Sequence, residues 1–279
     1  MNKGVNSPRV IKNVRFLRTG LVSAPGSGNT WIRFLIEQAT GLWTGSVFSD
    51  KSLYQGGLEG EIEQCHKNST VIIKAHHSGQ DERSNCTFER IVLVVRDLHR
   101  CLLAEFNRQI SKSHVGVVNE TLLHSEAWTK FIQQNSYGSA NINVNWISRF
   151  IEKTKKLKEN DDPFTLPANY WKTLLLVSYE RMKQDPMNEL ERILKFIGVP
   201  VFREYCLKKN PNGEFRRGKV KSAESIACLY DQPQLKTKMD LTIQYLMKSS
   251  KKLGAGNIIA NFERIENIDT NEKCIPSEL

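Results

Sequence analysis

The most regular feature of the sequence is a set of short apolar runs spaced along the chain. They are "TGLVSA" at 19–24, "TVIIKA" at 70–75, "IVLVVR" at 91–96 and "TLLLVSY" at 173–179. Apolar and β-branched residues follow one another in each run, without the alternation that marks a half-exposed strand. Strands buried on both faces of a parallel sheet have this composition. The runs therefore predict a parallel sheet at the centre of the molecule.

Between these runs, apolar residues recur at the spacing of a helix. The predicted helices cover 29–40, 98–110, 141–156 and 186–197. The last of them has the residues that begin and end a helix, with Asp185 as N-cap, Pro186 in the first turn and Gly198 past the end. Residues 222–255 are also predicted to be helical.

The order of these elements predicts the fold class. Strands that alternate with helices are typical of a doubly wound α/β domain. We predict an α/β fold of the P-loop type, with a doubly wound, mostly parallel sheet flanked by helices, in a single domain over 15–255. The stretches 158–169 and 207–221 are predicted loops, and the ends 1–14 and 265–279 are predicted to be flexible.

The first strand runs through a turn of small residues into the first helix, in the stretch "SAPGSGNTWIRF" (23–34). Such a turn aims backbone N–H groups and the positive end of a helix dipole at one point, where a phosphate or sulfate binds. The loop of ATP- and GTP-hydrolysing enzymes has a lysine after its last glycine, and Asn29 stands at that position here. A purely structural turn is the alternative. The predicted anion contacts are Gly26, Ser27, Gly28, Asn29 and Thr30.

The second strand ends in "IIKAHH" (72–77). Ligands of open parallel sheets bind beyond the carboxyl ends of the strands, and Lys74 and His76 share a face if the strand continues. A lysine can neutralise a leaving-group oxygen, and a histidine with a near-neutral pKa can accept a hydroxyl proton. The alternative is that His76 and His77 only cap a loop.

Arg96 ends the third strand, and Asp97 follows it as the N-cap of a helix. An arginine at this place can bind a phosphate through two parallel hydrogen bonds; a structural Arg96–Asp97 pair is the alternative. Further along, "FRRGKV" (215–220) is either a phosphate clamp or a solvated basic loop. Its candidate residues are Arg216, Arg217, Gly218 and Lys219.

Composition limits the class of protein and partner. The chain has 279 residues, 39% of them hydrophobic and 25% charged, with a formal net charge of +10, which suits one sizeable core and an anionic partner. A merely basic surface is the alternative. No apolar run approaches the roughly 18 residues of a membrane span, and the N-terminus has no secretory h-region. We expect a soluble, cytoplasmic protein if the chain is complete as given, and a Golgi-lumenal one if an N-terminal anchor is missing.

Six cysteines are present, without a CxxC pair or zinc-site spacing, so no structural metal is predicted. Their even number permits disulfides without arguing for them. Asn-x-Ser/Thr sequons begin at Asn68, Asn85 and Asn119, which is about the number that this composition produces by chance. The sequons therefore carry no weight for a secreted location.

Taken in order, these segments resemble the sulfotransferases that use 3′-phosphoadenosine 5′-phosphosulfate. "SAPGSGNTWIRFLIE" resembles their 5′-phosphosulfate loop, "IIKAHH" their Lys-x-His strand and "VVRDLHRCLLAEFNR" their 3′-phosphate strand and helix. "VSYERMKQDPMNELERILKFIGVP" resembles their strand and long Asp-Pro helix, and "FRRGK" their Arg-Lys-Gly loop. The resemblance covers about 17–221. Within the family it is similar to the WSC-domain-containing sulfotransferases, which are associated with glycoconjugate (sialic acid) sulfation, but the cysteine pattern of a WSC domain is absent.

The resemblance implies a reaction and a donor. A sulfuryl group would pass from the phosphosulfate donor to a hydroxyl, on a glycan, without a metal and without a nucleic-acid partner. The backbone of 26–30 would hold the 5′-phosphosulfate, with Trp31 and Tyr179 near the adenine. Arg96 and the 216–219 loop would hold the 3′-phosphate.

The resemblance also implies catalytic roles. His76 would remove the acceptor proton and Lys74 would support the leaving group, with Glu105 of "AEFNR" as a rival base. Three departures weaken the match: Gly26 replaces a loop lysine common in cytosolic members, Ala104 replaces a serine and Leu98 a proline. The alternatives are a P-loop nucleoside or sugar kinase and a catalytically weak homologue that binds the nucleotide.

Overall fold

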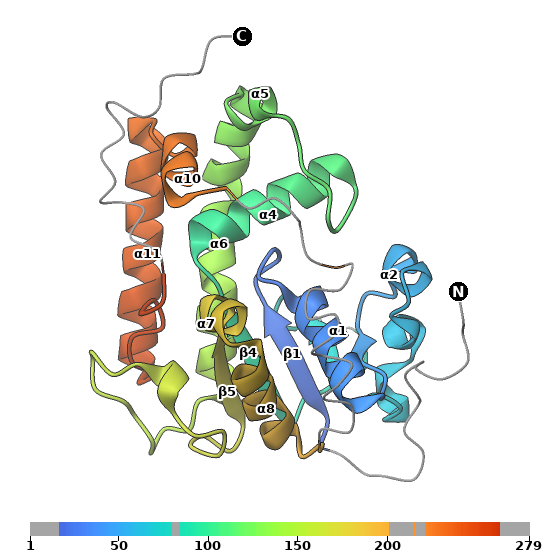
Figure 1. Ribbon diagram of the computed structural model, residues 1–279. Helices are drawn as coiled ribbons and strands as arrows, with labels where there is room; N and C mark the ends of the chain where they lie inside the picture. Colours follow the sequence, from blue (N-terminus) through green and yellow to red (C-terminus); the bar gives the residue numbers. More distant parts are fainter. Residues whose placement is uncertain (1–16, 80–83, 201–214, 216–220, 263–279) are drawn as a thin grey trace.

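A five-stranded sheet forms the centre of the described structure, a computed structural model that describes residues 17–79, 84–200, 215 and 221–262 (Figure 1). The strands are β1 (Thr19–Ser23), β2 (Gly45–Ser46), β3 (Ile73–Ala75), β4 (Arg90–Val95) and β5 (Leu174–Ser178). The α-helices are α1 (Asn29–Thr40), α2 (Lys51–Gln55), α4 (Leu98–Ser111), α5 (Glu120–Leu123), α6 (Glu126–Phe150), α7 (Tyr179–Gln184), α8 (Pro186–Ile197), α10 (Ala223–Leu229) and α11 (Pro233–Leu253). Short 3-10 helices are η1 (Glu59–Ile62), η2 (Cys65–Lys67) and η3 (Pro163–Thr165). The predicted flexible ends lie outside the described residues.

All described strand pairs are parallel, in the order β2-β3-β1-β4-β5. Leu21 of β1 pairs with Lys74 of β3 on one side and with Val92 of β4 on the other. The carboxyl ends of the strands therefore meet at one edge of the sheet, where α/β proteins bind ligands. The prediction of a parallel α/β sheet is confirmed.

Helices cover both faces of this sheet. Figure 1 shows α1 and α8 in front of the strands and α6 behind them. Within β4, Val92 and Val94 join the hydrophobic core that contains residues of α1 and α8, whereas Ile91, Leu93 and Val95 join the core formed with α4, α6 and α11. Both faces of the strand are buried, which explains its unbroken apolar sequence. None of the described helices has the length and apolar composition needed to cross a bilayer.

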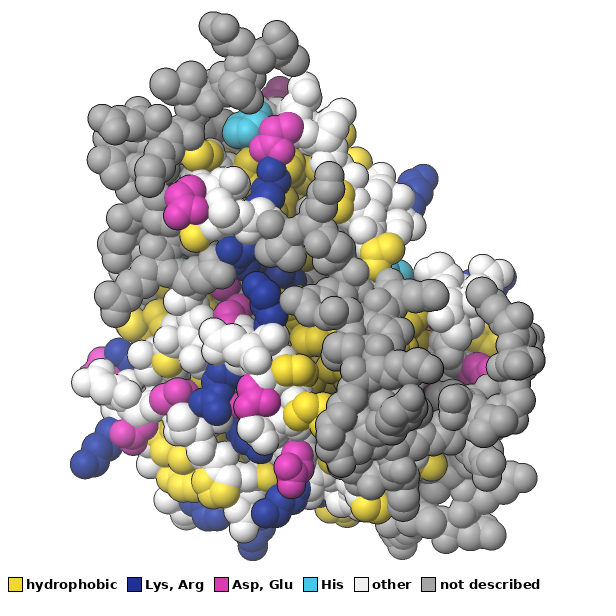
Figure 2. Space-filling view, in the orientation of Figure 1, with side chains coloured by type: hydrophobic (Ala, Val, Ile, Leu, Met, Phe, Trp, Pro, Cys, Tyr) yellow, Lys and Arg dark blue, Asp and Glu magenta, His cyan; other side chains and the backbone are white. Residues whose placement is uncertain are grey.

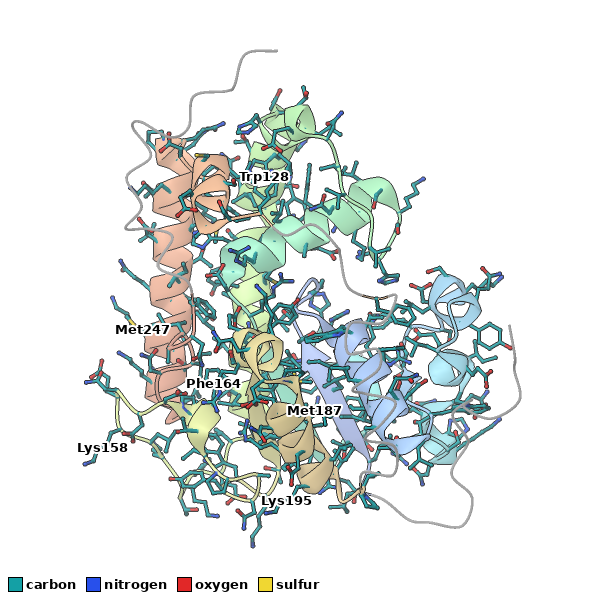
Figure 3. All side chains as sticks on the ribbon, viewed as in Figure 1. Trp128, Lys158, Phe164, Met187, Lys195 and Met247 are labelled. Carbon is teal, nitrogen blue, oxygen red and sulfur yellow. A yellow bond between two sulfur atoms is a disulfide. The ribbon has the colours of Figure 1, made fainter. Side chains whose placement is uncertain are left out.

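The structure differs from the predicted elements at three places. The helix predicted over 141–156 is α6, which begins at Glu126 and ends at Phe150. Its first half has Trp128, Phe131 and Ile132 at helical spacing, and these buried side chains hold it against the rest of the molecule. Trp128, labelled on α6 in Figure 3, donates from Nε1 to the carbonyl oxygen of Leu229 at 2.8 Å.

The other two differences have local causes. The single helix predicted over 222–255 is divided into α10 and α11 because Pro233, which lacks a backbone N–H, starts a new helix. The two-residue strand β2 was not predicted at all. By contrast, α1 and α8 have the predicted bounds, and Asp185 and Gly198 cap α8 as expected.

A buried ion pair fixes α1 to η1. Arg33 donates from Nη1 to Glu61 Oε2, and both side chains are fully buried. Arg33 also donates from Nε to Thr44 Oγ1 at 2.9 Å, and Glu37 accepts from the backbone and hydroxyl of Thr44. Glu61 accepts in turn from the backbone N–H of Asp50 at 3.1 Å. The segment between β2 and η1 is thereby held against α1.

We expect Arg33→Met to lower the free energy of unfolding by about 3–5 kcal/mol, because it leaves the Glu61 carboxylate buried without its cation. Adding Glu61→Gln should restore part of that loss, since the amide carries no charge and still accepts from Asp50. Urea unfolding of the wild type, the single variants and the double variant measures this. A double variant less stable than Arg33→Met would contradict a dominant charge–charge interaction.

Candidate active site

Two glycines shape the turn between β1 and α1. Gly26 and Gly28 have φ of 87° and 88°, a left-handed conformation that other residues rarely adopt. A Cβ at Gly26 would lie 2.2 Å from the carbonyl oxygen of Cys101, and one at Gly28 would lie 2.4 Å from the ring of Tyr179. The turn therefore packs directly on α4 and on the start of α7.

Contacts from α4 and β4 hold this turn in place. Arg96 donates from Nη1 to the carbonyl oxygen of Gly26 at 2.5 Å. Cys101 donates from Sγ to the carbonyl oxygen of Pro25 at 2.9 Å, and Ser27 Oγ lies 3.4 Å from the same sulfur. Burial raises the pKa of the Cys101 thiol to about 12, so it stays neutral and keeps its proton.

The residues predicted to contact an anion take different roles. Asn29 turns inward and donates from Nδ2 to the carbonyl oxygen of Leu21 at 2.8 Å, so the position of the missing lysine has a structural function. Ser27 uses its backbone N–H within the turn, on Ala24 O at 3.2 Å. Gly26, Gly28, Asn29, Thr30 and Trp31 line a cavity of about 490 Å³, whereas Ser27 does not. The N-terminus of α1 thus faces the cavity.

Lys74 and His76 line the same cavity, at the carboxyl end of β3. His77 is exposed and is not among the lining residues. His76 Nδ1 lies 2.8 Å from the carbonyl oxygen of Ser23. A carbonyl only accepts, so Nδ1 carries the proton and Nε2 carries the lone pair of the neutral ring. Any proton that the ring accepts would therefore add at Nε2.

Burial sets the charge state of these two residues. Burial, with the neighbouring Lys74 cation, lowers the pKa of His76 to about 3, so the ring is neutral at physiological pH, against the near-neutral pKa expected from the sequence. Burial, with the positive charge of Arg33, lowers the pKa of Lys74 to about 8, against the opposing effects of Glu61 and Asp50. Lys74 is therefore a cation at neutral pH that loses its proton far more readily than a surface lysine.

Phe48 covers both residues from the segment after β2. Its ring centroid lies 5.3 Å from Lys74 Nζ and 5.2 Å from the ring centroid of His76. Phe48 is 39% exposed and lines the cavity. The cavity thus has an aromatic wall directly beside its basic nitrogen and its cation.

Glu105, the rival base, also lines the cavity but is held in an ion pair. Arg108 donates from Nε and Nη2 to the two Glu105 oxygens at 2.8 and 2.6 Å, and Gln109 donates to Oε1 at 2.9 Å. These bonds occupy both oxygens of the Glu105 carboxylate. His76 and Glu105 therefore both line the cavity as candidates for the proton acceptor.

Aromatic rings and Arg96 form another part of the lining. Trp31 and Tyr179 meet edge to face, with ring centroids 5.8 Å apart. The Arg96 guanidinium carbon lies 4.1 Å from the Tyr179 ring centroid, and Arg96 Nε is buried without a hydrogen-bond partner among the described residues. Asp97 caps α4 by accepting from Arg100 N at 3.0 Å. The structural alternative of an Arg96–Asp97 pair finds no support in these contacts.

Several lining residues were missed by the sequence reasoning. His114 Nε2 lies 3.0 Å from Asp50 Oδ2 and joins the segment after α4 to the N-cap of α2. These residues lie in segments without periodic pattern, so no sequence signal identifies them. Figure 2 shows Lys and Arg side chains gathered at the centre of one face, over the region where Figure 1 draws α4, α7 and β1. The other lining cations are Arg100, Arg108, Lys183 and Lys221.

The predicted basic loop borders on Phe215, which is described, while its four candidate residues are not. Arg216, Arg217, Gly218 and Lys219 lie outside the described residues. Phe215, which precedes them, lines the cavity, and its ring centroid is 5.7 Å from that of Phe34 on α1. Among the described residues, no three His, Cys, Asp or Glu side chains gather at one point as a metal site would require.

Comparisons with known proteins give the family of this chain. Residues 18–210 match the family model for the sulfotransferase domain. A WSCD family member of Aedes aegypti is 32% identical over 206 residues, and one of Drosophila melanogaster is 31% identical over 206 residues. Each match covers 72% of this chain and 57% of the relative, so the chain spans little more than half the length of these curated relatives.

A solved structure matches the fold over most of its length. The crystal structure of mouse sulfotransferase SULT7A1 complexed with PAP superposes with a TM-score of 0.52 at 17% identity, covering 86% of each chain. The family model spans well over half of the chain, from β1 past α8, and includes the glycine turn, Lys74, His76 and Arg96. The chain therefore belongs to the sulfotransferase domain family.

Proposed function

We propose that this protein transfers a sulfuryl group from 3′-phosphoadenosine 5′-phosphosulfate to a hydroxyl group. One observation carries the proposal: the N-terminus of α1, the cation of Lys74 and the neutral imidazole of His76 line one cavity. An anionic donor suits the first two groups, and a hydroxyl acceptor needs the third. Family membership argues against the nucleoside or sugar kinase alternative.

The donor is proposed to bind in the part of the cavity lined by α1, α4 and α7. In the proposal, its 5′-phosphosulfate lies at the N-terminus of α1, where backbone N–H groups and the helix dipole favour an anion. The adenine lies near Trp31 and Tyr179, which already contact each other. The 3′-phosphate accepts from Arg96, whose Nε is buried without a described partner. Arg216 and Lys219 are proposed as further 3′-phosphate contacts.

Transfer then needs one proton acceptor and one cation. The acceptor oxygen attacks sulfur, the bond from sulfur to the bridging phosphate oxygen breaks, and the acceptor proton passes to His76 Nε2. Lys74 stabilises the negative charge that develops on the departing phosphate oxygen. The products are a sulfate ester and the 3′,5′-bisphosphate, and His76 returns its proton to solvent. Neither step uses a metal.

A glycan is the proposed acceptor. The resemblance to carbohydrate sulfotransferases supports this choice, as does the wall that the acceptor would meet. The exposed ring of Phe48 offers a surface for the apolar face of a sugar, and Asp50 and His114 offer hydrogen bonds beside it. The catalytically weak homologue is distinguished by direct assay, since it would bind the bisphosphate without turnover.

We expect His76→Ala to lower kcat by about 10²–10⁴-fold, the usual contribution of a general base, with little change in donor affinity. Lys74→Ala should lower kcat and also weaken donor binding, because it removes a charge that contacts the donor before and during transfer. Steady-state assays with labelled donor measure both parameters. His77→Ala is the matched control and should retain activity, since His77 is exposed outside the cavity. If Glu105→Gln loses turnover and His76→Ala stays active, the general base is Glu105 and not His76.

Alkaline pH should weaken donor capture. Lys74 must be protonated to bind the donor, so kcat/KM for the donor should fall about tenfold per pH unit once the pH exceeds the Lys74 pKa of about 8. Donor phosphates are fully ionised in that range, since their last pKa is about 6. Lys74→Arg keeps its charge and should remove the alkaline fall. If the alkaline fall in kcat/KM persists unchanged in Lys74→Arg, a group other than Lys74 causes it.

A further inference from the structure

A disulfide bond ties the segment before β3 to the segment before β4. Cys65 of η2 is bonded to Cys86, and their Cα atoms are 5.7 Å apart, within the usual range for disulfides. Both cysteines are buried. Disulfides form and persist in oxidising compartments and are rare in the cytosol. The pairing therefore favours folding in the secretory pathway over the cytoplasm.

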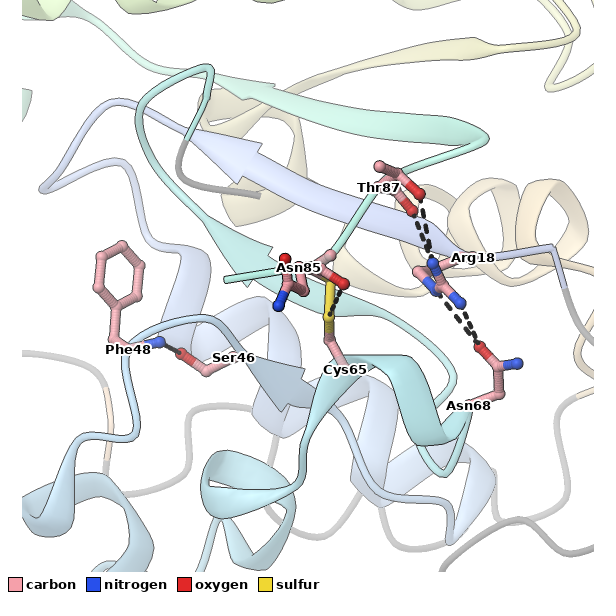
Figure 4. The surroundings of a disulfide bond; sticks show 8 residues. Arg18, Ser46, Phe48, Cys65, Asn68, Asn85 and Thr87 are labelled. Atoms are coloured by element: carbon pink, nitrogen blue, oxygen red, sulfur yellow. Dashed lines mark hydrogen bonds between the residues drawn. A yellow bond between two sulfur atoms is a disulfide. The ribbon is translucent and has the colours of Figure 1, made fainter. Parts of the chain in front are cut away.

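Two sequon asparagines lie next to this disulfide (Figure 4). Asn68 is the C-cap of η2, three residues after Cys65, and Asn85 immediately precedes Cys86. Both are exposed, and both have a left-handed backbone, with φ of 51° and 53°. Each therefore lies at the tip of a tight turn, where its side chain reaches solvent.

The existing contacts of Asn68 leave its nitrogen available for modification. Arg18 donates from Nε and Nη2 to Asn68 Oδ1 at 3.3 and 3.2 Å. In Figure 4 the amide nitrogen of Asn68 points away from Arg18. Substitution of one hydrogen on Nδ2 keeps the carbonyl oxygen and hence both hydrogen bonds.

The location also keeps a large modification away from the active site. Asn68 precedes the amino end of β3, and Asn85 precedes the amino end of β4. The cavity lies at the carboxyl ends of these parallel strands, and neither asparagine lines it. A bulky group on either turn would extend into solvent from the opposite edge of the sheet.

We propose that Asn68 and Asn85 carry N-linked glycans, attached in the oxidising compartment where the Cys65–Cys86 disulfide forms. The co-reactant is a lipid-diphosphate-linked oligosaccharide. A bond forms between Asn Nδ2 and the anomeric carbon, the bond from that carbon to the diphosphate oxygen breaks, and Nδ2 loses one proton as the lipid diphosphate leaves. The proposal does not depend on the sulfotransferase reaction. The sequons alone do not support the proposal, since their number is the number expected by chance. The support comes from the Cys65–Cys86 disulfide beside them.

The test routes the full chain into the secretory pathway of cultured human cells with a cleavable leader, in an Asn119→Gln background that removes the third sequon. Peptide N-glycosidase F should then increase the electrophoretic mobility of the secreted chain by two steps and convert Asn68 and Asn85 to Asp in peptide mass spectra. Thr70→Ala and Thr87→Ala should each remove one step, because they destroy one sequon.

Matched controls separate loss of the sequon from loss of the side chain. Thr70→Ser and Thr87→Ser keep each sequon and should keep each step. Mass spectra of unreduced peptides should show Cys65 joined to Cys86 in the same secreted chain. The proposal is overturned if either Asn68 or Asn85 of the secreted chain carries no glycan. It is also overturned if Cys65 and Cys86 are recovered as free thiols.

Discussion

The chemistry of the cavity depends on the burial of one ammonium group, that of Lys74, beside the ring of His76. Lys74 is the middle residue of β3, paired with Leu21 of β1 and with Ser46 of β2. Removal from water lowers its pKa to about 8, and its charge contributes to the low pKa of His76. The result is a lysine cation and a neutral imidazole side by side at neutral pH. An exposed histidine would keep its near-neutral pKa and would be partly protonated there.

A second constraint fixes where an anion can approach this pair. The turn after β1 lies so close to α4 and Tyr179 that only glycine fits at positions 26 and 28. Asn29 fastens the start of α1 to β1 in place of a lysine that would reach toward phosphates. In the proposed function, charge for the anion comes instead from the helix N-terminus, from Lys74 on β3 and from Arg96 directly after β4. This division of roles is consistent with a donor that is used without Mg²⁺.

The sequence predicted the parts of the molecule in which local pattern and tertiary packing agree. The helix over 186–197 has its caps and periodicity in one short stretch, and α8 has the same bounds. Lys74 lies in a buried strand, and the glycine turn and His76 follow buried strands directly, so their meeting at one edge of the sheet followed from topology. The first half of α6 was missed although Trp128, Phe131 and Ile132 have helical spacing, because the polar stretch 133–136 separates them from the apolar pattern of the second half.

Properties created by tertiary contacts were also beyond the sequence. The tautomer of His76 depends on the carbonyl oxygen of Ser23, and the low pKa depends on burial that no local pattern indicates. Phe48 and His114 reach the cavity from segments without periodicity. The pairing of Cys65 with Cys86 was one of many that six cysteines allow.

The most direct measurement of the central claim is isothermal titration calorimetry of the wild-type chain with two nucleotides. One is the 3′,5′-bisphosphate that remains after sulfuryl transfer, titrated in the presence of a metal chelator; the other is ATP with Mg²⁺. The account predicts tight binding of the bisphosphate without metal, and weak or no binding of ATP with Mg²⁺. Metal-dependent binding of ATP, with no heat from the bisphosphate, would contradict it.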